Sequence, residues 1–164
     1  MIEQTKIEYT KEQKLVEVSC LRCKETVKEL VSANPFNVRK MNRPFFSFFS
    51  LISHPNCIRQ LVEACRRFTL NANPVFSSVY QYIAFLENED TRSELLLNVL
   101  SLEQQLKELV GATKEHAVQA QYGKPEAGVE TKKHLEECGE EFLLTMEKLR
   151  PSNEGKFYSF WSRG

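Results

Sequence analysis

Glycine and proline are scarce in this sequence, with six of each among 164 residues. They fall mainly between segments in which apolar residues recur at helical spacing, so they mark the ends of helices. No segment shows the strict alternation of apolar and polar residues that is typical of a half-buried strand. These absences argue against an all-β architecture and predict an all-α fold with short connections.

The motifs of common catalytic and nucleotide-binding sites are also lacking. The sequence contains no HExxH zinc motif, no phosphate-binding P-loop and no GxGxxG dinucleotide fingerprint. A di-metal carboxylate bundle needs Glu-x-x-His pairs, and the sequence has none. We therefore predict no catalytic residue, no cofactor and no metal. An enzyme whose pocket the sequence does not reveal is the third-ranked class of function.

Long apolar runs are missing as well. No run approaches the roughly 18 residues that span a bilayer, and residues 1–8 lack the apolar core of a secretory signal peptide. We expect no membrane span and a cytoplasmic location, with non-classical export left open. A chain of this length is expected to form one domain over residues 1–164, with a sizeable core.

Cysteines are present in an odd number, which together with the lack of a signal peptide predicts reduced thiols. The five are Cys20, Cys23, Cys57, Cys65 and Cys138. With His54, the first three offer spacings that zinc sites use. Cys20 and Cys23, however, fall on an apolar helical seam, where a reduced cysteine behaves as a small hydrophobe. Core packing is the favoured interpretation.

The net charge is zero, but the two halves differ in sign. Residues 1–86 carry twelve basic against seven acidic side chains, and residues 87–164 carry ten against fifteen. Unevenly charged, solvated helix faces are the favoured explanation. A basic surface that binds nucleic acid is the alternative function. Its candidate residues are Arg39, Lys40, Arg43, Arg59, Arg66 and Arg67.

Apolar residues at alternating steps of three and four predict an irregular bundle of six or seven helices. The predicted helices cover about 10–33, 44–52, 55–70, 74–86, 91–122 and 129–149. Asn73 and Pro74 are expected to start one of them, and Asp90 or Thr91 to cap the next. Residues 44–52 hold four phenylalanines and no charge, so we expect a buried, central Phe-rich helix.

An aromatic segment closes the sequence and is the leading candidate for a partner-binding site. It contains Phe157, Tyr158, Phe160 and Trp161, after a proline stop and a short polar link. Segment 152–164 is expected either to dock on the bundle or to fill a groove on a partner or a second copy. The favoured function is a protein–protein interaction module, such as an adaptor, chaperone, inhibitor or effector, acting through a helix groove or face.

Overall fold

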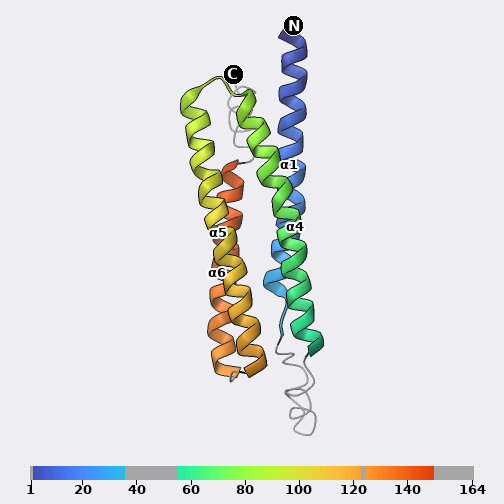
Figure 1. Cartoon of the computed structure of the whole chain (residues 1–164), viewed down its shortest axis with the longest axis vertical. Helices are drawn as coiled ribbons and strands as arrows, with labels where there is room; N and C mark the ends of the chain where they lie inside the picture. Colours follow the sequence, from blue (N-terminus) through green and yellow to red (C-terminus); the bar gives the residue numbers. More distant parts are fainter. Residues whose placement is uncertain (1, 36–54, 123–124, 150–164) are drawn as a thin grey trace, which may run out of the picture.

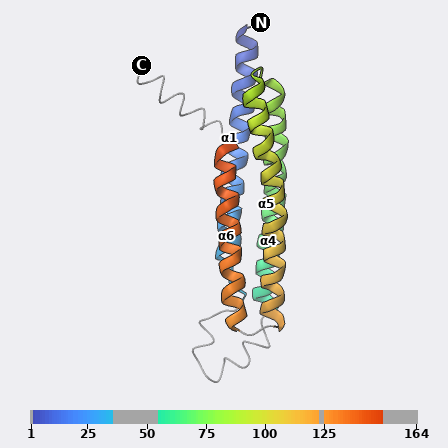
Figure 2. The same cartoon turned by 90° about the vertical axis from the view of Figure 1, so that its left-hand side faces the viewer.

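The computed structural model describes residues 2–35, 55–122 and 125–149. They form four α-helices and no strand within these ranges. The helices are α1 (Ile2–Ser32), α4 (Pro55–Phe85), α5 (Glu89–Tyr122) and α6 (Pro125–Leu149). Consecutive helices run in opposite directions along one long axis (Figures 1 and 2). The prediction of an all-α fold is confirmed for the described residues.

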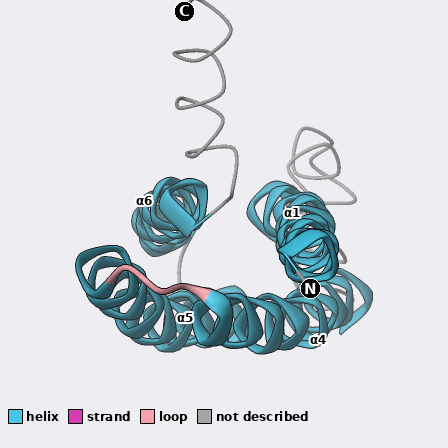
Figure 3. Cartoon of the chain, turned by 90° about the horizontal axis from the view of Figure 1, so that it is seen from above, coloured by secondary structure: helices cyan, strands magenta, loops and turns pink. Residues whose placement is uncertain are grey.

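The four helices pair in chain order around a common core. Contacts are most extensive between α1 and α4 and between α5 and α6, and the α4–α5 contact joins these two pairs. Seen from above, α4 and α5 lie on one side, with α1 and α6 opposite them (Figure 3). Of these four neighbouring pairs, α1 and α6 make the fewest contacts. The seam between α1 and α6 is therefore the least closed edge of the bundle.

The core follows the apolar seams that the sequence predicts. On α1 the buried stripe steps by four and three from Val16 through Cys20 to Leu30, and on α6 it runs from Leu135 to Leu149. Phe68 of α4 meets Phe142 of α6 edge-to-face across the core, with ring centroids 5.0 Å apart. This geometry suits the ring quadrupoles and ties two helices that are not neighbours in sequence.

The number of helices is a correction to the sequence prediction. The predicted helices 55–70 and 74–86 are one helix, α4, which continues through Pro74. Proline removes one backbone hydrogen bond, to the carbonyl of Leu70. Both Pro74 and Leu70 are exposed, so water can solvate that carbonyl. Meanwhile Ala72 and Val75 continue the buried stripe, and this packing outweighs the proline signal.

Helix boundaries differ from the prediction in smaller ways. α1 begins at Ile2 instead of near residue 10, and α6 begins at Pro125, a residue that suits a first helical turn. The cap of α5 is Asn88, not Asp90 or Thr91, because its Oδ1 accepts a hydrogen bond of 2.9 Å from the Asp90 amide. The predicted Phe-rich helix 44–52 lies outside the described residues.

Two glycines inside helices have opposite surroundings. A Cβ built on Gly139 of α6 would lie 2.6 Å from Val31 Cγ2 and 3.6 Å from Val27 Cγ1, both on α1. A Cβ on Gly111 of α5 would meet nothing within 4 Å. Gly139 therefore permits α6 to approach α1 closely, whereas Gly111 has no packing role among the described residues.

This contrast gives a matched pair of substitutions. Gly111→Ala should raise the free energy of unfolding by about 1 kcal/mol, because alanine is the better helix former. Gly139→Ala should instead lower it by about 1–3 kcal/mol, since the added methyl forces α6 away from α1. Urea denaturation of both variants measures the difference, and Val31→Ala in the Gly139→Ala background should recover part of the loss. An equal gain in both variants would contradict the close α1–α6 approach.

Candidate functional site

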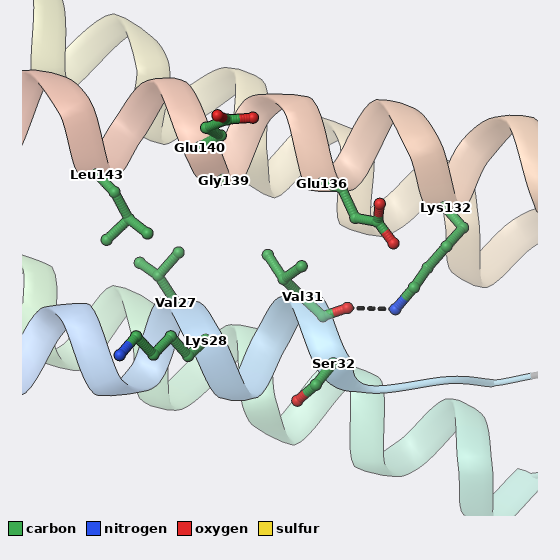
Figure 4. Close-up of a pocket in the computed structure, with 9 residues that line it drawn as sticks. All are labelled: Val27, Lys28, Val31, Ser32, Lys132, Glu136, Gly139, Glu140 and Leu143. Carbon is green, nitrogen blue, oxygen red and sulfur yellow. Dashed lines mark hydrogen bonds between the residues drawn. The ribbon is translucent and has the colours of Figure 1, made fainter.

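A groove of about 390 Å³ lies between α1 and α6. We call it the α1–α6 groove (Figure 4). Its lining residues are Val27, Lys28, Val31 and Ser32 from α1, and Lys132, Glu136, Gly139, Glu140 and Leu143 from α6. The groove follows the pair of neighbouring helices that touch least, which is where a bundle leaves room for a further element.

The floor of the groove is apolar. Val27 is fully buried, whereas Val31 and Leu143 are half-buried and so remain partly open to solvent. These three side chains point into the space between the helices (Figure 4). Because Gly139 has no side chain, the methyl groups of Val31 pack directly against the backbone of α6 at this point, and Gly139 is buried. An incoming apolar side chain would find van der Waals partners here on both walls.

The rims of the groove carry opposite charges. Lys28 stands on the α1 side, and Glu136 and Glu140 stand on the α6 side, all three of them exposed. Among the described residues, no ion pair joins Lys28 to either glutamate. Their charges are thus available to a bound segment, and paired rim charges contribute more to orientation and selectivity than to affinity.

Lys132 links the two helices at one end of the groove. Its Nζ donates to the carbonyl oxygen of Val31 (Figure 4) and, at 3.3 Å, to that of Ala33. The last carbonyls of a helix lack partners within the helix and favour a positive charge, so Lys132 of α6 caps the C-terminus of α1. Burial lowers the pKa of Lys132, and the nearby Glu136 opposes that shift.

A small polar cluster lies close to Lys132, inside the bundle. His116 of α5 is buried, and its Nδ1 lies 2.6 Å from Oγ1 of Thr131 on α6. The Thr131 hydroxyl also reaches the carbonyls of Ala127 and Gly128, so its hydrogen can go to one of these and its oxygen can accept from His116. Burial, helped by the positive charge of Lys132, lowers the pKa of His116 to about 4. The imidazole is therefore neutral at pH 7.

The pKa values of the Cys23, Cys65 and Cys138 thiols are all raised by burial, which favours their protonated form. Burial raises the pKa of Cys23 to about 12, and it also raises the pKa of Cys65 despite a hydrogen bond with Thr113. Nucleophilic catalysis requires the thiolate, which low-pKa, accessible cysteines supply. Cys20, Cys23 and Cys138 are buried, as the core-packing interpretation predicts. His54, which would complete the zinc set with Cys57, lies outside the described residues.

Metal-binding side chains do not gather in the described part of the chain. No group of three or more histidine, cysteine, aspartate or glutamate side chains is placed to hold an ion there. Cys20 and Cys23 follow the seam of α1 into the core, so their spacing reflects helical packing.

The six basic candidates are only partly placed by the structure. Arg59, Arg66 and Arg67 all lie on α4 and are exposed, whereas the candidates at positions 39, 40 and 43 lie outside the described residues. Arg67 pairs with Glu29 of α1, and Arg66 lies 3.7 Å from Glu63. Two of the three described arginines thus already have acidic partners, which weakens a phosphate-binding surface.

The aromatic candidates Phe157, Tyr158, Phe160 and Trp161 lie outside the described residues. The α1–α6 groove itself is not among the sequence predictions, which fixed the buried seam of each helix but not which helices adjoin. The available signal was Gly139, seven residues after Lys132 and four before Leu143. That spacing places a bare patch and flanking side chains on one helix face.

None of the described helices contains an apolar stretch long enough to cross a membrane. No protein-family model matches the chain, and neither a curated protein nor a solved structure shows significant similarity to it. The functional argument therefore depends on the geometry of the groove and the chemistry of its residues.

Proposed function

We propose that this chain is a protein–protein interaction module and that its α1–α6 groove receives apolar side chains of a partner. The single observation that carries the proposal is the open seam between α1 and α6, with an apolar floor, a glycine in one wall and charged rims. Binding sites are commonly concave and largely apolar, with a few polar groups that fix orientation. The groove has this composition.

The rims define the kind of partner segment that fits. A segment with two or three apolar anchors can occupy the floor formed by Val27, Val31 and Leu143. Basic residues beside the anchors would complement Glu136 and Glu140. Recognition by side chains laid in a groove between helices is a recurrent mode of peptide binding. The described residues offer no observation that favours nucleic-acid binding or catalysis over this reading.

The test compares two adjacent leucines of α6. Leu143 is half-buried in the groove, whereas Leu144 is 60% exposed and does not line it. Leu143→Asp should abolish capture of the proteins that bind the wild-type chain in a cell extract, because a carboxylate on the apolar floor is costly to bury. Leu144→Asp should leave that capture unchanged. Quantitative mass spectrometry of the captured proteins gives the readout, and circular dichroism checks that both variants remain helical.

Two outcomes would count against the proposal. Equal capture by the wild-type chain and both variants would mean that binding does not use the groove. Capture that disappears after nuclease treatment, together with a steep dependence on salt, would favour the nucleic-acid alternative.

A further inference from the structure

The α1–α6 groove lies close to the point where α6 ends, and this bears on what fills it. α6 ends at Leu149, six residues after Leu143, which is about 9 Å along a helix. The aromatic segment begins at Phe157, so residues 150–156 separate it from α6. Seven extended residues span up to roughly 23 Å. The connection is therefore long enough to turn back and bring the aromatic side chains over the groove.

The chemistry of this segment matches the groove. Its four aromatic side chains would expose a large apolar surface in water, and such surfaces usually mark a contact site. The segment carries Lys156 before the aromatic residues and Arg163 after them, with no acidic residue from Lys156 to the end of the sequence. The α6 rim is acidic through Glu136 and Glu140. The aromatic side chains thus suit the apolar floor, and the two basic residues suit the glutamates of the α6 rim, although Lys28 on the α1 rim and Lys132 at one end are also basic.

We propose that the α1–α6 groove is occupied in cis by the chain's own C-terminal segment, residues 152–164, whose aromatic side chains contact Val31 and Leu143, above the fully buried Val27. The inference uses the same groove as the proposed function and adds its regulation. A short tether gives an effective concentration in the millimolar range, so a partner has to displace the segment before it binds. The segment is in that case an autoinhibitory ligand of the partner site.

The only tryptophan of the chain, Trp161, reports on this contact. In the protein of residues 1–164 its fluorescence should be blue-shifted and several-fold less quenched by acrylamide than in a synthetic peptide of residues 152–164. Leu143→Asp should bring quenching to the level of the peptide, and Leu144→Asp should not change it. Reversing one rim charge with Glu140→Lys, at an exposed position that does not contribute to the core, should also increase quenching.

A tail variant tests the contact with the groove unaltered. Phe157→Ser combined with Phe160→Ser should shift the methyl resonances of Val27, Val31 and Leu143 and leave that of Leu144 in place. Three results would overturn the inference: peptide-like quenching in the wild-type protein, equal protection of Trp161 in the Leu143 and Leu144 variants, or protection that disappears on dilution. The last result would identify a second copy as the occupant.

The two proposals can fail separately. If Leu143→Asp abolishes partner capture while Trp161 is already exposed in the wild-type protein, the partner site stands and cis occupancy is wrong. If Trp161 is protected by the groove but partner capture is unaffected by Leu143→Asp, the segment is a structural part of the bundle and the partner site is wrong.

Discussion

Phe142→Ala should lower the free energy of unfolding by about 3–5 kcal/mol, the largest effect expected of any single substitution considered for this chain. Phe142 is fully buried on α6 and meets Phe68 of α4 edge-to-face, with ring centroids 5.0 Å apart. Truncation removes its buried surface and the aromatic pair, and it leaves a cavity between helices that cannot close fully. Urea denaturation monitored by circular dichroism measures the loss.

The matched control for this substitution lies on the same helix. Leu144→Ala changes an exposed leucine two residues away and should shift the free energy of unfolding by no more than about 0.5 kcal/mol. If the two variants unfold at the same urea concentration, Phe142 does not hold the core position described here.

The second large effect is a dependence of stability on pH through His116. Its pKa is lowered from 6.5 to about 4 because the ring is buried and faces the positive charge of Lys132. Folding therefore favours the neutral imidazole. Well above pH 6.5 His116 is neutral in both the folded and the unfolded state, so it has no effect on stability. As the pH falls from 6.5 towards 4, the unfolded chain binds a proton that the folded chain does not, so stability decreases.

The expected loss from His116 is about 1 kcal/mol at pH 5.5 and about 3 kcal/mol below pH 4. Denaturant unfolding at pH 7.5 and at pH 5.5 measures the first of these values. His116→Gln keeps a polar side chain beside Thr131 but does not titrate, so its stability should change much less between the two conditions. The same decrease in the wild-type protein and in the variant would show that other groups cause it.

Much of the core could be predicted because apolar spacing alone specifies which face of a helix is buried. The stripe from Val16 to Leu30 and the stripe from Leu135 to Leu149 are both buried as expected. Spacing was less successful at the edges of a stripe. Val62 and Tyr80 are apolar residues beside the buried stripe of α4, but they are 51% and 39% exposed. Both lie beside the core, where contact with a neighbouring helix decides whether a side chain is buried or exposed.

Helix-start signals in the local sequence also gave wrong helix boundaries where tertiary packing favoured a continuous helix. The sequence Asn73-Pro74 is a good start signal for a helix, yet α4 passes through it because its buried stripe is continuous from Phe68 to Val79. Propensity acts over a few residues, whereas a long helix gains from packing along its whole length. This is why the predicted helices 55–70 and 74–86 form one helix, α4, while the predicted helix 44–52 lies outside the described residues.

The α1–α6 groove could not be predicted from the sequence, because it depends on contacts between helices that are distant in the chain. Its lining requires that α1 and α6 be neighbours, although they lie at opposite ends of the described chain. Lys132 illustrates the point, because its role as the cap of α1 depends on carbonyls about a hundred residues earlier. Periodicity gives the buried face of each helix but not the identity of the helix it meets.

The central claim is that the α1–α6 groove binds aromatic side chains, and nuclear Overhauser contacts in the protein of residues 1–164 test it most directly. Samples with labelled valine and leucine methyl groups would be examined for cross-peaks to the ring protons of Trp161 and of the tail phenylalanines. The account predicts cross-peaks from Val31 and Leu143, and none from Leu144. Groove methyl groups that contact only residues of the four helices, with Trp161 free in solvent, would contradict it.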